Sequence, residues 1–410
     1  MINGEMRLSR PFRWAMVGGG RHSQVGYKHR TGALRDNACY QLVAGAFDID
    51  PERGKDFGMN IGVEEERCYP DYQTMFAKEA DRNDGIEVVS IATPNGTHYE
   101  ICKAALKAGL HVICEKPLFF TSKEGEEIKA LAEEKQKIVG VTYGFSGNQM
   151  LLQMRAMIEQ GMIGEIRVVD LQYTHGFSIT DEAEKTSNAQ KWRVDPNIAG
   201  PSFVLGDLAT HTYYMSQMIM PSMKITKLLC DRQSFVGSRF PLEDNAHVLM
   251  HYENGAVGTM WVSSINAGCM DGHRIRIVGS KASLEWWDNN PGELRYEVQG
   301  EPIQTLVRGM PYLDAAASED ERLGALHTEG LSDAWANIYH RIALAIDAKN
   351  KGDNKKLKEL VYPGIDAGID GVRWVENCVR SANAGAVWVN YKEGIIDDQP
   401  HHEIAPSSKI

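Results

Sequence analysis

The stretch F-R-W-A-M-V-G-G-G-R-H-S, residues 12–23, decides the fold of the first part of the chain. Residues 12–17 form an apolar run with aromatic and β-branched side chains, which predicts a strand. The glycines that follow allow a tight turn in which the backbone can approach a pyrophosphate at the N-terminus of the next helix. We therefore expect a dinucleotide-binding loop of the G-x-G-x-x-(G/A) type, with Ser23 in its third position. The loop residues expected at the cofactor are Gly18, Gly20, Arg21, His22 and Ser23.

Short apolar runs alternate with helical patterns up to about residue 145, as is typical of a parallel sheet covered by helices. Asp50 before Pro51 predicts one helix start, and Thr121 with Glu124 three residues later predicts another through a capping box. The expected architecture is α/β, with a doubly wound Rossmann domain over residues 12–146. The expected strands are 12–17, 40–47, 86–92, 111–114 and 138–143.

Asp48 stands at the end of the second predicted strand. A carboxylate there can accept hydrogen bonds from the adenosine ribose hydroxyls and repels a 2′-phosphate, which favours NAD over NADP. The alternative is a turn or cap residue before Asp50. The distance from Gly20 to Asp48 is longer than usual, and we attribute it to a longer first helix over 27–35.

The second half of the chain has a different pattern, in which predicted strands are joined by tight turns. Asn254-Gly255 between 247–253 and 256–265 predicts one hairpin, and 279–281 between 274–278 and 283–287 predicts a second. We expect an α/β domain over 147–390 with a large, mostly antiparallel open sheet. Residues 391–410, with His401 and His402, are interpreted as a surface arm and not as a metal site. The expected helices are 148–160, 208–218, 331–348 and 365–382.

The composition narrows the possible partners. The chain has 410 residues, 43% of them hydrophobic, and a formal net charge of -11. Nucleic acids and anionic membranes attract basic surfaces, so neither is expected as a partner and a small-molecule substrate fits better. The seven cysteines form no CxxC pair and no zinc-ligand spacing, which favours reduced thiols, no metal and a cytoplasmic location. No signal peptide or membrane span is apparent.

Five motifs then follow in order along the chain. They are Thr93-Pro94-Asn95-Gly96-Thr97-His98, Glu115-Lys116-Pro117, Trp192-Arg193-Val194-Asp195-Pro196, Gly206-Asp207-Leu208-Ala209-Thr210-His211 and His327-Thr328-Glu329-Gly330. Together they resemble the glucose–fructose oxidoreductase / inositol dehydrogenase / rhizopine catabolism (Gfo/Idh/MocA) family, nearly end to end. The motifs that begin at Trp192 and at His327 also resemble a subgroup of that family that includes dehydrogenases of sugars and sugar anhydrides.

The resemblance implies site residues and an oligomer. An open sheet in the second domain of such proteins often mediates contacts between subunits, so a homo-oligomer is expected. Lys116 would be the catalytic lysine, and Asp207 and His211 would be the catalytic pair. The residues implied at the cofactor are Thr93, Pro94, Asn95, His98, Glu115 and Lys116, with Trp192 and Arg193 at the border between cofactor and substrate.

The chemistry of these three residue types supports the same roles. Oxidation of a secondary alcohol needs a base for the hydroxyl proton and a nearby cation for the developing alkoxide. Asp207 and His211 are four residues apart, so on a helix they would project from one face, and histidine is a suitable base near neutral pH. We hypothesise that His211 takes the proton, Lys116 polarises the oxygen and Asp207 binds an adjacent hydroxyl. The alternatives are a solvated lysine, a helix-capping aspartate and a core histidine.

The substrate is left open by departures from the family pattern. Gly144 occupies a position where the family pattern would fit Asn, and Thr328 occupies one where related chains tend to have Pro. The segment around His175 also differs from the sequence expected of the subgroup. Both 142–148 and 172–177 are expected to face the substrate. The residues expected to bind it are Lys116, Tyr143, His175, Arg193, Asp207, His211 and His327.

Three functions remain as hypotheses. The first is an NAD-dependent dehydrogenase of a ring hydroxyl in a sugar, glycoside, sugar anhydride or inositol, including C3 of a glucoside. The second is a redox-assisted glycosidase that regenerates its NAD. The third is a regulator that senses a dinucleotide without catalysis.

Overall fold

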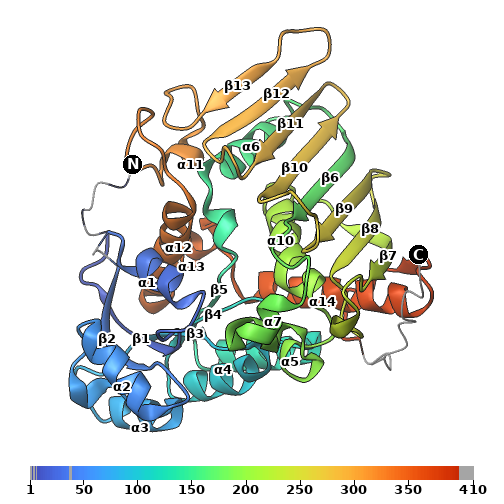
Figure 1. Cartoon of the computed structure of the whole chain (residues 1–410). Coiled ribbons are helices and arrows are strands. Elements are labelled where there is room, and N and C mark those ends of the chain that lie inside the picture. Colours follow the sequence, from blue (N-terminus) through green and yellow to red (C-terminus); the bar gives the residue numbers. More distant parts are fainter. Residues whose placement is uncertain (1, 3–4, 6, 37–38, 397–410) are drawn as a thin grey trace. The chain divides into compact units, whose positions relative to one another are not determined.

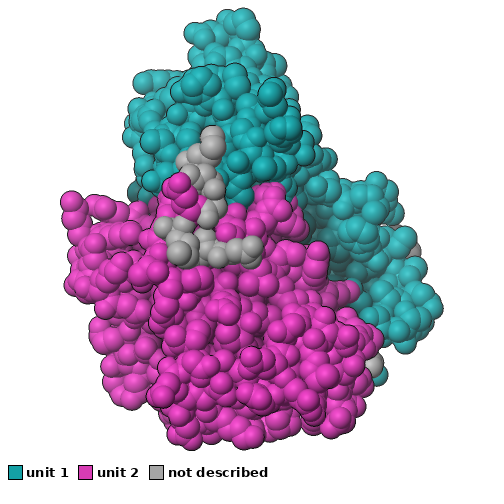
Figure 2. All heavy atoms as spheres, turned by 90° about the vertical axis from the view of Figure 1, so that its left-hand side faces the viewer, with its two compact units in different colours: residues 1–2, 148–330, 371–410 teal, residues 3–147, 331–370 magenta. Residues whose placement is uncertain are grey.

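A computed structural model describes residues 2, 5, 7–36 and 39–396, the side chains of 188 and 189 excepted. The chain forms two compact units, which Figure 2 distinguishes by colour. Unit 2 comprises residues 3–147 and 331–370, and unit 1 comprises residues 1–2, 148–330 and 371–410. Residues 397–410, with His401 and His402 of the predicted arm, lie outside the described residues.

Unit 2 is built on a five-stranded sheet with the strand order β2-β1-β3-β4-β5 (Figure 1). Every pairing between neighbouring strands is parallel, which confirms the predicted Rossmann architecture. The chain passes from β1 to β2 on one side and to β3 on the other, so the switch point lies between β1 and β3. The strands are β1 (Phe12–Gly18), β2 (Tyr40–Ala46), β3 (Val88–Ala92), β4 (His111–Cys114) and β5 (Val139–Val141).

The helices of unit 2 begin where the sequence signals them. Asp50 caps α2, since its side chain accepts hydrogen bonds from the N–H groups of Glu52 and Arg53. Thr121 and Glu124 form the predicted capping box of α5. The helical elements up to residue 147 are α1 (Gly26–Leu34), α2 (Pro51–Asn60), η1 (Glu65–Arg67), α3 (Tyr72–Ala80), η2 (Asn95–Thr97), α4 (His98–Lys107), α5 (Ser122–Glu134) and η3 (Gly144–Gly147).

A late segment of the chain completes unit 2. Helix α12 (Leu331–Lys351) is buried along most of its length, and its Tyr339 ring meets that of Trp14 edge-on at 6.1 Å between centroids. Ile338 and Ile342 join the same apolar core as β1. α13 (Asn354–Glu359) follows, and the Val141 N–H donates to the carbonyl of Pro363 at 2.8 Å. The sequence predicts a second domain that extends from 147 to 390 without interruption. Residues 331–370 belong instead to unit 2, because α12 supplies side chains to the core of that unit.

Unit 1 contains a nine-stranded sheet with the order β13-β12-β11-β10-β6-β9-β8-β7-β14 (Figure 1). Only the pairing of β6 with β9 is parallel, so the prediction of a large, mostly antiparallel sheet is confirmed. The strands are β6 (Ile166–Thr174), β7 (Ile225–Gln233), β8 (Asn245–Tyr252), β9 (Val257–Ser263), β10 (Gly272–Gly279), β11 (Ala282–Trp287), β12 (Glu293–Val298), β13 (Gln304–Val307) and β14 (Val389–Asn390).

Helices cover one face of this sheet. α6 contacts β11 and β12, and α10 contacts β6 and β10. Burial alternates along β8, with His247 and Leu249 exposed between buried neighbours, so the other face is open. The helical elements are α6 (Gln149–Glu159), α7 (Glu182–Thr186), α8 (Asn188–Lys191), η4 (Trp192–Val194), α9 (Pro196–Ala199), the π-helical turn η5 (Leu205–Ala209), α10 (Thr210–Ile219), η6 (Gly237–Arg239), α11 (Ala315–Ser318) and α14 (Ile365–Asn383), whose residues 371–383 belong to unit 1.

Candidate functional site

The glycine loop after β1 leaves no room for side chains. Gly18 and Gly19 have positive φ angles of 75° and 73°, which glycine adopts without strain. A Cβ on Gly18 would lie 2.6 Å from the carbonyl oxygen of Ala92, and one on Gly20 would lie 2.5 Å from that of Phe47. The bare backbone at the carboxyl end of β1 therefore has the form that a pyrophosphate needs.

The third glycine of this loop is Gly26, which corrects the assignment of that position to Ser23. A Cβ on Gly26 would lie only 2.0 Å from the Gly19 carbonyl oxygen, because α1 begins here and presses on the loop. Ser23 instead accepts a hydrogen bond from the Gly26 N–H through Oγ, at 3.0 Å. Helix α1 has 9 residues, so the long spacing to Asp48 comes from the loop over 19–25 and not from a longer helix. The signal available in the sequence was a glycine six residues after Gly20.

Asp48 lies beyond the end of β2 and is held by several contacts. Arg53 Nη2 donates to its Oδ1 at 2.7 Å, and the Asp50 N–H donates to the same oxygen at 3.0 Å. Burial raises the pKa of Asp48, but the hydrogen bonds with Arg53 and Asp50 and the charges of Arg53 and His22 outweigh it, so the pKa is lowered. Asp48 is therefore an ionised carboxylate that also makes a turn contact, and the helix cap itself is Asp50.

The two other loop residues expected at the cofactor are polar and at least partly accessible. Arg21 pairs with Asp56 of α2 at 2.7 Å, and both side chains are exposed. His22 is near enough to Asp48 for its charge to lower the pKa of that carboxyl. Cofactor contacts of Arg21, His22 and Ser23 stay predictions.

Hydrogen bonds between its own residues stabilise the loop after β3. Thr97 Oγ1 donates to Thr93 Oγ1 at 2.7 Å, and Asn95 is buried in the short turn η2. His98 is fully buried, with Nε2 3.0 Å from the Thr93 carbonyl oxygen and Nδ1 3.1 Å from that of Pro117. The ring thereby connects this loop to the one that carries Lys116. Pro94 precedes η2, as its N-cap residue.

Glu115 and Lys116 follow β4 directly. Glu115 Oε1 accepts from Thr142 Oγ1 at 2.6 Å and lies 3.2 Å from His29 Nε2, while Oε2 accepts the Lys116 N–H at 3.2 Å. Burial alone would raise the pKa of Glu115, but the contact with His29, the charges of His29 and Lys116 and the hydrogen bond from Thr142 lower it to about 2. Lys116 is half-buried, which does not fit the alternative of a solvated lysine. Tyr143 is fully buried beside Thr142.

In unit 1, Asp207 lies in the π-helical turn η5 and not at a helix start. Its N–H donates to the Phe203 carbonyl at 2.8 Å, and no side-chain cap is present at α10, so the capping alternative is wrong. Asp207 Oδ2 lies 3.6 Å from Arg193 Nε, a separation too long for a strong hydrogen bond. π-Helical turns frequently occur at functional sites.

His211 is in the first turn of α10 and is 7% exposed. Its ring lies 6.4 Å from that of Tyr173, which stacks on His273 at 4.2 Å. His175 follows β6, and burial lowers its pKa although the charge of Asp207 acts to raise it. Asp207, His211 and His175 therefore gather around Tyr173 and the end of β6.

Two further predicted site residues of unit 1, Arg193 and His327, lie in different surroundings. The Arg193 guanidinium lies over the Trp192 ring, 4.5 Å from its centroid, which ties the cation of the Arg193–Asp207 pair to an aromatic surface. His327 is exposed on a loop whose carbonyl groups at Gly324 and His327 accept hydrogen bonds from Arg308. Arg308 in turn pairs with buried Glu329 at 3.1 Å.

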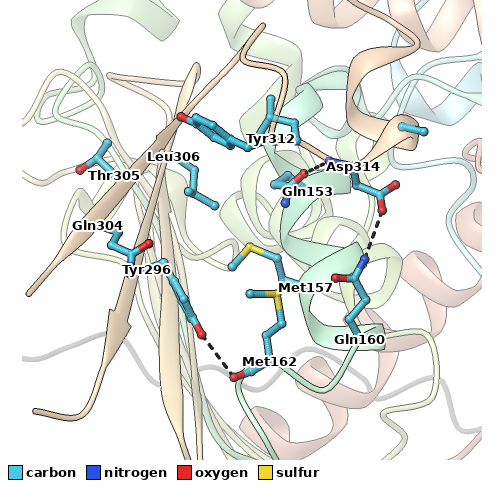
Figure 3. Close-up of a pocket in the computed structure, with 12 residues that line it drawn as sticks. Gln153, Met157, Gln160, Met162, Tyr296, Gln304, Thr305, Leu306, Tyr312 and Asp314 are labelled. Atoms are coloured by element: carbon cyan, nitrogen blue, oxygen red, sulfur yellow. Dashed lines mark hydrogen bonds between the residues drawn. The ribbon is translucent and has the colours of Figure 1, made fainter. Parts of the chain in front are cut away.

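A separate pocket of about 900 Å³ lies in unit 1 between α6, β12 and β13 (Figure 3). The Asp314 N–H donates to Gln153 at 2.7 Å and Gln160 donates to the Asp314 carboxylate at 3.2 Å across its wall. None of the predicted site residues lines it. The lining residues are Gln153, Met157, Gln160, Met162, Tyr296, Gln304, Thr305, Leu306, Tyr312, Leu313, Asp314 and Ala315.

Two kinds of feature are absent from the part of the chain that the structure describes. Within residues 7–36 and 39–396 no three His, Cys, Asp or Glu side chains are grouped as metal ligands would be. Of the helices that the structure describes, none combines the length and apolar character needed to cross a membrane.

The predicted residues thus form one set in each unit. Unit 2 holds the glycine loop, Asp48, the β3 loop, Glu115, Lys116 and Tyr143, and unit 1 holds His175, Trp192, Arg193, Asp207, His211 and His327. The sequence reasoning missed His29, which contacts Glu115, whereas Thr142 and Tyr173 lie in the two segments expected to face the substrate. His29 belongs to no motif, since the fold brings it to Glu115.

Two sequence profiles match the chain. Residues 12–143 match the profile described as "Oxidoreductase family, NAD-binding Rossmann fold". Residues 155–391 match "Oxidoreductase family, C-terminal alpha/beta domain", and both profiles carry the designation GFO_IDH_MocA.

Several known proteins are similar to the chain, two of them over nearly its whole length. The uncharacterized oxidoreductase YfiI of Bacillus subtilis is 81% identical over 392 residues, which are 96% of this chain and all 100% of YfiI. An inositol dehydrogenase homolog of Azotobacter vinelandii, crystallised with NADH and myo-inositol, is 56% identical with a TM-score of 0.90, covering 95% of this chain and 100% of that one. Levoglucosan dehydrogenase of Pseudarthrobacter phenanthrenivorans is 30% identical over 219 residues, 48% of this chain and 55% of that protein.

Proposed function

Because the chain belongs to the Gfo/Idh/MocA family and is an NAD-dependent oxidoreductase acting on CH–OH groups, we propose that it oxidises a ring hydroxyl of an inositol. The observation that carries this proposal is the 56% identity, over 95% of the chain, to a protein crystallised with NADH and myo-inositol. The second substrate class is a sugar or sugar anhydride, favoured by the shorter match to levoglucosan dehydrogenase.

The residues of unit 2 fit NAD. Gly18, Gly20 and Gly26 leave the backbone bare where a pyrophosphate would rest, and α1 begins at Gly26 with its N-terminus toward the loop. The ionised Asp48 would accept hydrogen bonds from the adenosine ribose. The β3 loop from Thr93 to His98 would line the nicotinamide side, with Glu115 behind it. When bound, NAD supplies the acceptor for the hydride that leaves the substrate carbon.

The chain's own residues would handle the proton and the charge on oxygen. His211 would take the hydroxyl proton through a ring nitrogen, and the Lys116 ammonium would stabilise the alkoxide that forms. Asp207 would hold a neighbouring hydroxyl, while Arg193 orients the Asp207 carboxylate through their 3.6 Å contact. The hydroxyl groups of a polyol are chemically suited to each of these side chains.

The other residues expected at the substrate complete the proposal. We expect Tyr143, His175 and His327 each to contact the substrate and to discriminate between polyols. His175 is the best supported of them, because the charge of Asp207 acts on it. Trp192 would border both ligands through its contact with Arg193.

A substrate panel tests the proposal. Protein stripped of cofactor is incubated with NAD or NADP and with inositols, hexoses and aryl glycosides, while reduced nicotinamide and released aglycone are both followed. NADH formed in proportion to an oxidised inositol is expected. Aglycone release without net NADH would favour the redox-assisted glycosidase, and tight NAD binding without either product would favour a sensing regulator.

We also propose that the protein acts as a homo-oligomer through the open face of its nine-stranded sheet. That face presents exposed His247 and Leu249, and Trp261 stacks on His247 at 5.8 Å between ring centroids. Light scattering of the purified protein is expected to give a dimer or tetramer mass, and a monomer at micromolar concentration would contradict it.

A further inference from the structure

The pocket between α6, β12 and β13 is a cavity whose lining residues all belong to unit 1. Its volume of about 900 Å³ is within the range of roughly 300–1,000 Å³ that is typical of small-molecule sites. Figure 3 shows Tyr296 and Leu306 pointing from the strands toward Met157 and Gln153 of α6. None of the residues assigned to cofactor or substrate lines this pocket, so the proposed oxidation makes no use of it.

Gln153 supplies a buried hydrogen-bond donor to the wall of the pocket. Its side chain is 6% exposed, and its Oε1 accepts the Asp314 N–H at 2.7 Å. This bond fixes which end of the amide is oxygen, and Figure 3 shows the amide nitrogen on the side away from Asp314. None of the residues that the structure describes accepts a hydrogen bond from this Nε2. A buried donor of this kind is satisfied when a ligand places an oxygen atom beside it.

Two tyrosine hydroxyls add further donors. Tyr312 Oη accepts the Val307 N–H at 2.9 Å, which leaves its own proton for another acceptor. Tyr296 Oη lies 3.5 Å from the Met162 carbonyl oxygen, a separation at the limit of a hydrogen bond. A ligand that satisfies these groups must therefore carry several acceptor atoms.

Apolar side chains line the space between these donors. Met157 and Leu313 are buried, and Leu306 and Tyr296 are half-buried. A purely apolar ligand would cover these side chains but would leave the Gln153 donor without a partner. The lining therefore favours a ligand that alternates oxygen atoms with C–H surface.

The charge of the lining disfavours ionic ligands. Among the described residues that line the pocket, Asp314 is the only charged one. Its Oδ1 accepts the Ala316 N–H at 3.0 Å, and its Oδ2 accepts a hydrogen bond from Gln160 at 3.2 Å. A phosphate or carboxylate would meet this negative charge without a cation in the lining, and an ammonium group would meet the Gln153 donor. The ligand that fits is neutral.

We propose that this pocket binds a neutral disaccharide or glycoside. A sugar hydroxyl both accepts and donates a hydrogen bond, so it suits the donors of Gln153 and Tyr312 and also the amide oxygens of Gln160 and Gln304, which are exposed at the rim. A single hexose would leave most of the 900 Å³ empty, which favours a larger ligand. The site does not depend on the function proposed for the Rossmann domain and its catalytic residues.

Calorimetric titration of the full chain tests the site. Protein saturated with NADH and myo-inositol is titrated with the neutral disaccharides cellobiose, maltose, sucrose and trehalose, and with glucose 6-phosphate and adenosine for comparison. We expect saturable binding of at least one disaccharide with a dissociation constant of about 1 mM or lower, and no binding of the two comparison ligands. Absence of saturable binding for all four disaccharides, or binding of a comparison ligand alone, would overturn the proposal.

Two substitutions locate the bound sugar. Leu306→Trp places a larger side chain in the pocket from β13 and should abolish binding, whereas Ile303→Trp, at an exposed residue that does not line the pocket, should bind as wild type. Gln153→Glu keeps an oxygen for the Asp314 N–H but, once ionised, has no N–H to donate, so affinity should fall by about 10-fold or more. Thermal unfolding shows which variants are folded, and either pocket variant is sufficient for the test.

Oxidation of inositol is measured in the same variants. Turnover should be unchanged in Leu306→Trp and Gln153→Glu, because neither residue belongs to the cofactor or substrate site. Disaccharide affinity equal to wild type in a folded pocket variant would overturn the proposal, since the sugar would then bind elsewhere. Protein that binds a disaccharide in the pocket but oxidises no inositol would refute the proposed function alone.

Discussion

Two carboxylates, buried Glu115 in unit 2 and half-buried Asp288 in unit 1, have opposite electrostatic environments. In unit 2 Glu115 faces His29, Thr142 and the Lys116 N–H, and its pKa is lowered to about 2. In unit 1 burial and the charge of Asp271 raise the pKa of Asp288 to about 7. The same functional group is thus fully compensated in one unit and uncompensated in the other.

This difference shows which of the two units holds its polar side chains in a fixed arrangement. Glu115, next to Lys116, is held at hydrogen-bond distances by Thr142 and the Lys116 N–H, as a site that binds the same cofactor in every turnover requires. In unit 1, burial and the charge of Asp271 instead act together to keep the Asp288 carboxyl protonated. A carboxyl in such surroundings reduces stability when it is ionised, so we expect mutations in the two units to behave differently.

The largest effect is expected from Lys116→Ala. Loss of the ammonium that stabilises the alkoxide should lower kcat by roughly 10² to 10³, while NAD binding changes little. Steady-state kinetics and a fluorescence titration with NADH measure the two quantities. Lys107→Ala, an exposed lysine at the end of α4, is the matched control and should keep wild-type turnover. Unchanged turnover in Lys116→Ala would remove the lysine from the mechanism.

Gly26→Ala should affect mainly the cofactor. The added methyl group would lie 2.0 Å from the Gly19 carbonyl oxygen, so the loop must move. Overpacking of this kind costs about 1–3 kcal/mol, which corresponds to a rise of about 10-fold to 100-fold in the dissociation constant for NAD. Gly237→Ala, where nothing lies within 4 Å of the added Cβ, serves as the control. Wild-type affinity in Gly26→Ala would mean that Gly26 does not shape the loop.

Asp48→Ser should weaken the preference for NAD. The change removes the charge that repels a 2′-phosphate and releases Arg53, which pairs with Asp48 at 2.7 Å. We expect the ratio of kcat/KM for NAD to that for NADP to fall by about 10-fold or more. Asp50→Ser makes the same change at a helix cap that serine also satisfies, and should leave the ratio as it is. An equal fall in both variants would assign the effect to the fold of the loop.

The smallest effect is a gain of stability in Asp288→Asn. A carboxyl whose pKa is raised from 3.8 to about 7 binds a proton in the native state, so stability declines as the pH rises through that window. The variant should exceed the wild type by on the order of 1 kcal/mol at about pH 8 and match it at about pH 4. Urea unfolding at both pH values measures this, with exposed Asp231→Asn as the control. A variant less stable than wild type at the higher pH would show that Asp288 is compensated after all.

Most of the fold could be predicted from sequence because its signals are local. The strands of unit 2, the capping box at Thr121 and the hairpin at Asn254-Gly255 follow from periodicity and turn chemistry, and all are present. The packing of α12 in unit 2 could not be predicted, since an amphipathic helix does not specify which sheet it covers. The loop over 19–25 likewise concealed Gly26, because its length moves the third glycine out of the usual spacing.

The candidate site was predictable only where motifs carry it. Lys116, Asp207 and His211 were reached from short motifs, and their catalytic roles stay predictions. His29 and Tyr339 are 310 residues apart and meet only in the folded unit, so no local pattern could associate them. The π-helical turn at Asp207 was also missed, because an i, i+4 spacing gives the same pattern in an ordinary helix.

The most direct test of the central claim follows the hydrogen that is transferred. The protein is incubated with NAD and with myo-inositol carrying deuterium on its ring carbons, and the NADH formed is examined by mass spectrometry. We predict one deuterium in the dihydronicotinamide ring for each inositol oxidised, together with a primary isotope effect on turnover when chemistry limits it. NADH without deuterium, or label found only in the solvent, would contradict a direct transfer from a ring CH–OH carbon.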